Sequence, residues 1–152
     1  MTQHQPLTVG SRAPMFTLKD AKGNTVSLRE LIATKPVLLF FYPGDMTPGC
    51  TMQLCAIRDE WEAFKKADVH IFGVNHANAQ SHTAFSDAYH FPFHLLIDEG
   101  KKVSTQYGAI RKFFKTLIIK RTVVGIAKDG TIFYYKAGMP KNADILKALP
   151  KK

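Results

Sequence analysis

The chain has 152 residues, of which 45% are hydrophobic and 22% are charged. This length and composition exclude a disordered chain and predict one globular domain over residues 1–152. The longest apolar run, residues 37–42, is too short to span a bilayer, and the polar residues 1–6 lack the apolar segment of a signal peptide. We therefore expect a cytoplasmic protein without a membrane span.

The charge is strongly positive, with 21 Lys and Arg against 12 Asp and Glu, a formal net charge of +9. Such an excess permits binding to nucleic acid or to anionic surfaces. The densest basic stretch, residues 111–121, has no helix-turn-helix, zinc-finger or RNA-recognition pattern. We therefore expect a solvated basic face and no nucleic-acid partner. The alternative, a nucleic-acid-binding module, would show a steep salt dependence of DNA binding.

The first predicted elements lie in the N-terminal third of the chain. Residues 15–19 and 25–28 are short extended runs on either side of a Gly/Asn turn, which predicts an N-terminal β-hairpin. The continuous apolar run 37–42 follows Pro36 and is typical of a buried central strand of a parallel sheet. A loop over residues 43–46 follows this strand.

The longest predicted helix begins at Thr47, a favourable N-cap residue, and runs to about Lys66. Pro48 suits its first position. On a helical wheel Cys50 faces inward with the apolar stripe, whereas Cys55 lies about 140° away on the polar side. The apolar stripe consists of Leu54, Ile57, Trp61 and Phe64, and the polar side of Arg58, Asp59, Glu62 and Lys66.

The rest of the chain alternates between strands and helices. Strands are predicted at 69–74 and 94–97, a second hairpin at 121–126 and 131–135, and helices at 78–89, 101–106 and 142–149. In the helix at 78–89 we expect Phe85, Ala88 and Tyr89 to face inward. This order predicts an α/β sandwich in which helices flank a mixed central sheet, an arrangement like that of thioredoxin.

Cys50 is the strongest candidate for a reactive side chain. It takes the third helical position, where backbone N–H groups have no helical acceptors and the helix dipole is positive. Both effects favour a thiolate over a thiol. The position also follows the carboxyl end of a buried strand, where α/β sheets place their ligands. The alternative is that Cys50 is only a small buried hydrophobic residue.

The residues around Cys50 resemble those of a known family. Pro43, Thr47 and Cys50 match the pattern P-x-x-x-[TS]-x-x-C of the peroxiredoxins. Residues 41–51, with Cys55 downstream, are similar to the bacterioferritin-comigratory, or Q-type, subgroup, and the likeness covers most of the chain. The resemblance implies a thioredoxin-like fold and thiol-based reduction of hydrogen peroxide and organic hydroperoxides.

The resemblance also implies roles for individual residues. Cys50 would be the peroxidatic cysteine, Thr47 would hold the thiolate and the peroxide by its hydroxyl, and Pro43 would shield the site from water. A family arginine lies on a later strand shortly before a turn that ends in Asp-Gly. Arg121, nine residues before Gly130, has this spacing. The alternative is that Arg121 is a surface arginine in a basic cluster.

Cys55 is expected to resolve the sulfenic acid on Cys50 by forming an intramolecular disulfide. On an intact helix the two Cα atoms would be about 8–9 Å apart, beyond the reach of about 7 Å that a disulfide allows. Oxidation would therefore have to unwind the helix around both cysteines. In the alternative, Cys55 is idle and an external thiol resolves the sulfenic acid.

The sequence therefore predicts a peroxiredoxin that is re-reduced by thioredoxin or a similar dithiol. The six histidines show no metal-ligand spacing with the cysteines, and no Gly-rich phosphate loop is present, so we expect neither metal nor cofactor. A long C-terminal extension with a further cysteine is absent from the sequence, which favours a monomer. An alternative function is a redox-sensing or interaction protein that uses the Cys50–Cys55 pair as a switch.

Overall fold

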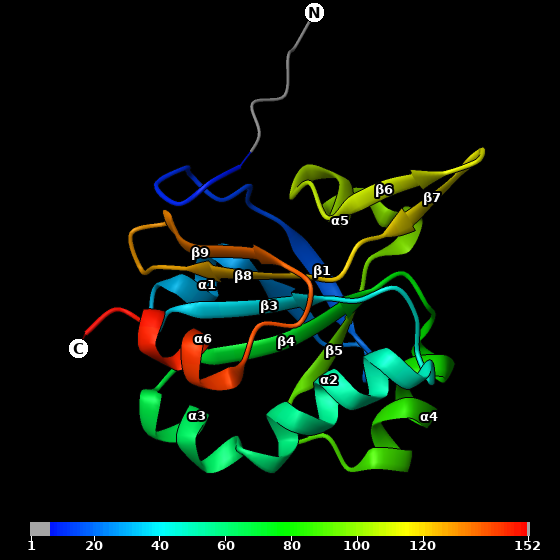
Figure 1. The fold of residues 1–152 in the computed structure, drawn as a ribbon, viewed down its shortest axis with the longest axis horizontal. Coiled ribbons are helices and arrows are strands. Elements are labelled where there is room, and N and C mark those ends of the chain that lie inside the picture. The colour runs from blue at the N-terminus through cyan, green and yellow to red at the C-terminus, as the bar shows by residue number, and fades with distance from the viewer. Residues whose placement is uncertain (1–6, 152) are drawn as a thin grey trace, which may run out of the picture.

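A seven-stranded sheet forms the centre of the molecule in the computed structural model, which describes residues 7–151 (Figure 1). The strand order is β2-β1-β5-β4-β3-β8-β9. Strands β3, β4 and β5 are mutually parallel, and the other pairings are antiparallel, so the predicted mixed sheet is confirmed. Its strands are β1 (Thr17–Asp20), β2 (Thr25–Ser27), β3 (Val37–Phe41), β4 (His70–Asn75), β5 (His94–Ile97), β8 (Thr122–Ile126) and β9 (Ile132–Ala137).

Strand β3 is central because all five of its residues are apolar and buried. Its alternate side chains point to opposite faces of the sheet, as the pleat requires. Leu39 and Phe41 belong to one hydrophobic cluster, whereas Leu38 and Phe40 belong to a second cluster on the other face. Both faces therefore need a cover of helices.

Helices supply that cover and complete the predicted α/β sandwich. Helices α2, α3, α4 and α6 line the second cluster, on the lower side of the sheet in Figure 1, while α1 and α5 contribute to the first. None of the described helices is long and apolar enough to cross a membrane. The helices are α1 (Leu28–Ile32), α2 (Pro48–Asp59), α3 (Trp61–Ala67), α4 (Ala79–Tyr89), α5 (Lys102–Gln106) and α6 (Asn142–Ala148), with a 3₁₀ turn at Glu99–Lys101.

The long helix expected from Thr47 to Lys66 is two helices, so this prediction was wrong in its extent. Helix α2 ends at Asp59, and Glu60 leaves helical geometry with φ −107° and ψ 24°. The Glu60 N–H is shared between the carbonyls of Ala56 and Arg58, which tightens the last turn of α2. No proline or glycine lies at this break, so the apolar helical repeat in the sequence continues across it without interruption.

One short helix and one hairpin were not predicted. Helix α1 has only five residues, too few to show a helical repeat. Strands β6 (Ile110–Phe113) and β7 (Thr116–Ile119) form a separate two-stranded hairpin that projects from the body at the right of Figure 1. Its loop residues, Phe114 and Lys115, are not the Asn-Gly or Asp-Gly pairs that identify a tight hairpin turn.

Helix α4 has the predicted bounds but a different inward face. Phe85 is buried as expected and Tyr89 is half-buried, but Ala88 is exposed. The other buried residue of α4 is His82. His82 can be buried here because the carboxylate of Asp45, in the loop after β3, forms a hydrogen bond with its ring.

Candidate active site

The candidate active site lies where β3 leads into α2. Thr47 is extended, with φ −78° and ψ 146°, and acts as the N-cap residue, while Pro48 opens the helix. The N–H of Thr51 donates to the carbonyl of Thr47 at 2.9 Å and closes the first turn around Cys50. The predicted position of Cys50 in the first turn of a helix is therefore confirmed.

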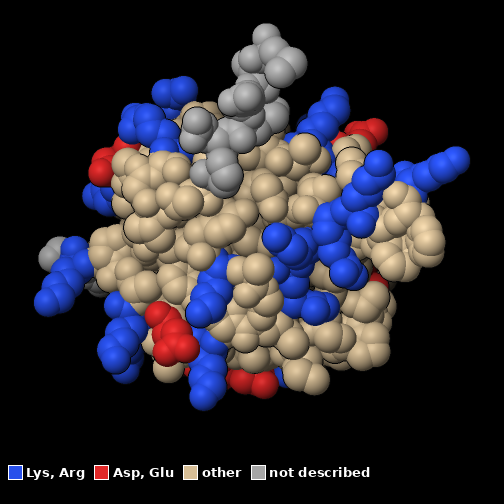
Figure 2. All heavy atoms as spheres, turned by 45° about the horizontal axis from the view of Figure 1, so that its top comes forward, with Lys and Arg blue, Asp and Glu red and all other residues tan. Residues whose placement is uncertain are grey.

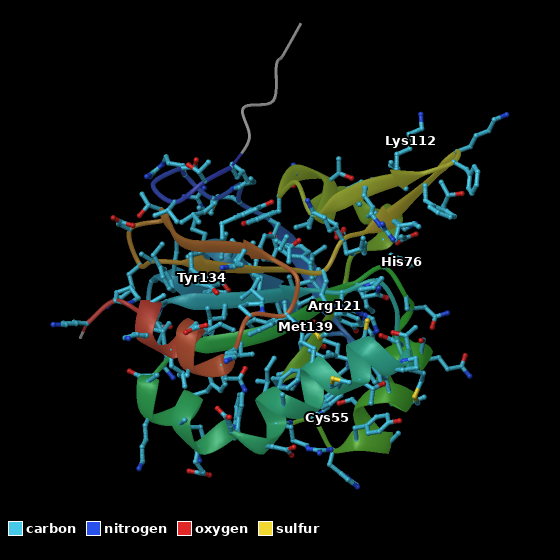
Figure 3. All side chains as sticks on the ribbon, in the orientation of Figure 1. Cys55, His76, Lys112, Arg121, Tyr134 and Met139 are labelled. Atoms are coloured by element: carbon cyan, nitrogen blue, oxygen red, sulfur yellow. The ribbon has the colours of Figure 1, made fainter. Side chains whose placement is uncertain are left out.

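Cys50 is fully buried, and its sulfur has a cationic partner. Nη2 of Arg121 donates to Sγ of Cys50 at 3.2 Å, across a sequence separation of 71 residues. Sheet topology creates this contact, because Thr122, the first residue of β8, pairs with Phe41, the last residue of β3. Arg121 directly precedes β8 and so lies beside the start of α2 (Figure 3).

Gly49 makes room for the guanidinium of Arg121. A Cβ at Gly49 would lie 2.8 Å from Nη2 and 3.3 Å from Cζ of Arg121, too close for either atom. Nε of Arg121 is also buried and has no hydrogen-bond partner among the described residues. A buried N–H group without a partner is unusual in folded proteins.

Thr47 and Pro43 are placed in the loop that precedes Cys50. The hydroxyl of Thr47 is at the surface and donates to the carbonyl of Gly44 at 2.9 Å, so in this structure it points back into the loop instead of to the sulfur. It also makes no side-chain cap on α2. The first N–H groups of α2 are therefore not taken up by a Thr47 cap. Pro43 is half-buried.

A buried carboxylate, which the sequence analysis missed, anchors the same loop. Asp45 accepts hydrogen bonds from the hydroxyls of Tyr42 at 2.6 Å and Ser81 at 2.7 Å, and from Nδ1 of His82 at 2.7 Å. Nε2 of His82 lies 3.0 Å from the carbonyl of Leu96 in β5. The helical spacing of His82 and Phe85 on α4 was the available signal, and it was overlooked in favour of Ala88.

The hydrogen bonds indicate how this network is charged. Burial alone would raise the pKa of the Asp45 carboxyl, but the hydrogen bonds from His82, Tyr42 and Ser81 outweigh it and lower the pKa. A carboxylate and a carbonyl only accept, so both ring nitrogens of His82 face hydrogen-bond acceptors. The side chains of His82 and Asp45 are 0% and 4% exposed, so they form a buried ion pair. Burial, followed by the charge of Asp45, raises the pKa of Tyr42, which keeps its hydroxyl a donor.

Cys55 lies in the same continuous helix as Cys50, and both cysteines are free. The predicted position on the polar side was partly wrong, because Cys55 is half-buried and packs against the second hydrophobic cluster. The break at Glu60 turns Glu62 and Lys66 onto a separate helix, so Cys55 does not share a straight polar face with them. Burial raises the pKa of the Cys55 thiol, and the charge of Arg58 only partly offsets this.

Within residues 7–151 no group of three or more His, Cys, Asp or Glu side chains could hold a metal ion. Three features of the described site bear on its reactivity. They are a buried sulfur at a helix start, a guanidinium in contact with it, and a loop fixed by a buried ion pair.

Comparisons with known proteins identify the family of this chain. The AhpC/TSA family model matches residues 9–135. The chain is 48% identical over 125 residues to a protein of Triticum aestivum described as peroxiredoxin Q, chloroplastic, and 46% identical over 126 residues to its counterpart in Sedum lineare. These matches cover 82% and 83% of the chain, which spans 57% and 67% of the two relatives.

Solved structures show the same fold. A peroxidoxin, BcpB, of Mycobacterium tuberculosis has a TM-score of 0.86 at 30% identity, with 93% of this chain and 96% of that chain covered. A bacterioferritin comigratory protein of Xanthomonas campestris, described in terms of its alkyl peroxide reduction activity, has a TM-score of 0.77 at 26% identity, with 88% and 86% covered. The predicted thioredoxin-like fold is confirmed. The chain thus belongs to the AhpC/TSA family, and its relatives are peroxiredoxins of the Q type.

Proposed function

We propose that the chain is a thiol-dependent peroxidase in which Cys50 attacks the peroxide. The observation that carries this proposal is the contact of 3.2 Å between Nη2 of Arg121 and Sγ of Cys50 at the start of α2. A guanidinium and a helix N-terminus both stabilise a thiolate, which is the nucleophilic form of cysteine. The family membership agrees with this chemistry.

The reaction needs one bond to form and one to break. The Cys50 sulfur bonds to one peroxide oxygen, the O–O bond breaks, and the other oxygen takes a proton and leaves as water or an alcohol. Cys50 is left as a sulfenic acid. Donors aimed at the leaving oxygen lower the barrier, and the free Nε–H of Arg121 and the N–H groups of the first turn of α2 are suited to this role.

The other two predicted site residues, Thr47 and Pro43, would act from the loop between β3 and α2. A rotation of the Thr47 side chain away from Gly44 would bring its hydroxyl to a bound peroxide, since Thr47 opens the turn that holds Cys50. Pro43, half-buried between β3 and this turn, would limit the access of water. Both roles belong to the proposal.

Resolution by Cys55 and reduction by a thioredoxin-like dithiol complete the proposed cycle. Both thiols are in one helix, five residues apart, so the disulfide requires unwinding of α2. A monomer is proposed, as expected from the sequence. Sedimentation equilibrium tests this state, and cell fractionation tests the expected cytoplasmic location.

The central test is removal of the sulfur. In Cys50→Ser, peroxide decay with excess thioredoxin and thioredoxin reductase should fall to the rate without enzyme. The matched control is Cys55→Ser, which should still consume one equivalent of peroxide and accumulate the sulfenic acid, detected by mass. Decay at the wild-type rate in Cys50→Ser would contradict the proposal. A protein that oxidises once but does not turn over would instead be the redox switch considered from the sequence.

A further inference from the structure

The β6–β7 hairpin is an exposed projection with a fixed base. Ile119 is buried, and the N–H of Lys120 donates to the carbonyl of Ala109 at 2.8 Å, so the hairpin is anchored where it leaves the body. All residues from 111 to 117 are exposed. Figure 3 shows Lys112 pointing away from the protein. The outer part of the hairpin therefore adds little to the core.

The tip of the hairpin is apolar in spite of this exposure. Phe113, Phe114 and Leu117 are 52%, 83% and 44% exposed. The rings of Phe113 and Phe114 are in contact, with centroids 4.6 Å apart, and Leu117 lies in the facing strand, paired with Lys112. Single exposed apolar residues are normal, but a contiguous group marks a surface for contact.

Phe114 also occupies an unfavourable backbone position. Its φ is 56°, in the left-handed region, at the first residue of a two-residue loop. Such positions favour glycine or asparagine, and a bulky side chain is strained there. No packing against the body compensates this strain, because the ring is almost fully exposed. A large aromatic residue at this place serves a contact outside the fold.

The segment of the chain that contains this tip carries most of the net positive charge. Residues 100–128 contain eight Lys and Arg and no Asp or Glu, whereas the rest of the chain has 13 against 12. This segment therefore carries eight of the nine net positive charges. Figure 2 shows a group of Lys and Arg side chains on the right-hand part of the face in view, near the hairpin. The ion pairs within residues 7–151 do not include Arg111, Lys112 or Lys115.

We propose that the tip of the β6–β7 hairpin docks on an anionic phospholipid surface, with Phe113 and Phe114 inserted and Arg111, Lys112 and Lys115 on the head groups. Aromatic rings prefer the membrane interface, and each Lys or Arg near an anionic bilayer strengthens binding about fivefold. The tip is convex and apolar at its end, with cations directly behind it. A fluid bilayer can take up such a tip without a preformed pocket. A folded protein partner would need a pocket that fits the tip.

Docking would place the bilayer at the end of the molecule that carries the active site. The hairpin and the first turn of α2 lie at the same, right-hand end of the molecule in Figure 1. Arg121, which contacts Cys50, follows the end of β7 by two residues. The docking surface itself goes beyond the proposed peroxidase and does not depend on it.

Vesicle sedimentation tests the proposal without any peroxide. The wild-type protein should bind vesicles of phosphatidylcholine and phosphatidylserine at low salt and not vesicles of phosphatidylcholine alone. In the Phe113→Thr/Phe114→Gly variant, threonine favours the strand and glycine favours the turn. The fold should therefore persist while vesicle binding falls at least about tenfold. Lys112→Glu/Lys115→Glu should lose binding to a similar extent. The matched control, Lys141→Glu/Lys147→Glu at helix α6, changes the net charge equally and should bind like the wild type.

The outcomes separate this proposal from the proposed function. Cys50→Ser should bind vesicles like the wild type even though it cannot reduce peroxide. Absence of wild-type binding, or equal binding by the Phe113→Thr/Phe114→Gly variant, would overturn the docking surface. If vesicles are not bound and the hairpin variants instead raise the KM for a protein reductant, the surface serves a protein partner and the lipid proposal is wrong.

Discussion

At the scale of single residues, the site depends on a small residue beside a large one. Gly49 has no side chain, and the guanidinium of Arg121 occupies the space that a Cβ would need. A larger residue at position 49 would displace the guanidinium of Arg121 from its place at the Cys50 sulfur. The family pattern around Cys50 leaves position 49 open, and only the contact with Arg121 shows why a small residue fits there.

Gly49→Ala should mimic the loss of Arg121 without harming the fold. Alanine favours a helix over glycine by about 0.5–1 kcal/mol, so thermal stability should hold or rise. The displaced guanidinium should slow sulfenic acid formation, toward the roughly 100-fold loss expected for Arg121→Ala. Stopped-flow measurement of Cys50 oxidation with hydrogen peroxide checks this.

Arg121→Lys is the companion variant, because it keeps the charge but loses the planar fork. Its rate should fall between those of the wild type and Arg121→Ala. An unchanged rate in all three variants would show that another cation, such as Arg58 or Arg111, supports the thiolate.

At the scale of secondary structure, α2 must be both stable and able to open. Its first turn holds the thiolate, and its continuity keeps Cys50 and Cys55 apart. Its second half is tied to the body, since Nη1 of Arg58 donates to the carbonyl of Tyr89 and the amide of Asn142 donates to the carbonyl of Ala56. The break at Glu60 separates it from α3. Unwinding can therefore start at the first turn and stop before α3.

Peroxide treatment should increase amide hydrogen exchange in the first turns of α2 and leave α3 protected. The reason is the separation of about 8–9 Å between the Cα atoms, which a disulfide cannot bridge in a helix. Exchange measured by mass over residues 47–67 in the reduced and oxidised protein tests this. In Cys55→Ser the exchange should not change. Equal protection in both states of the wild type, without an intramolecular disulfide, would leave a one-cysteine enzyme resolved by an external thiol.

At the scale of the whole molecule, the Asp45–His82 pair joins three distant segments. It links the active-site loop to α4 and, through Leu96, to β5. Both side chains are almost completely buried, so water cannot take the place of either partner when that partner is removed. Loop geometry and global stability are therefore coupled.

Asp45→Asn should lower the free energy of unfolding by about 3 kcal/mol at neutral pH, because it removes the buried carboxylate that accepts hydrogen bonds from Tyr42, Ser81 and His82. Folding lowers the pKa of Asp45, so its contribution is present above the unfolded pKa of about 3.9 and is lost as pH falls through the folded value. The gap between wild type and variant should therefore shrink only below about pH 4.

Urea unfolding of both proteins across pH measures this gap. In a double-mutant cycle with His82→Gln, the combined loss should be smaller than the sum of the single losses. Additive losses, or a gap that stays constant into acid, would show that the two groups do not act as a pair.

The sequence by itself determined the local structure around Cys50 and the order of the strands and helices. Thr47, Pro48 and the apolar run before them specify a strand, a loop and a helix start through interactions between neighbours in the chain, which sequence patterns record. The alternation of elements likewise predicted the mixed sheet. The motif also pointed to Arg121, although only the pairing of β8 with β3 brought its guanidinium to the sulfur.

Only the tertiary structure decided the features that depend on contacts between distant segments. The buried ion pair needs Asp45 and His82 to meet from two elements, and a helical wheel of α4 alone cannot distinguish a buried histidine from an exposed one. The helix break at Glu60 and the hairpin at β6–β7 have no glycine or proline to mark them. Their geometry follows from how the ends pack on the body, which local propensity does not contain.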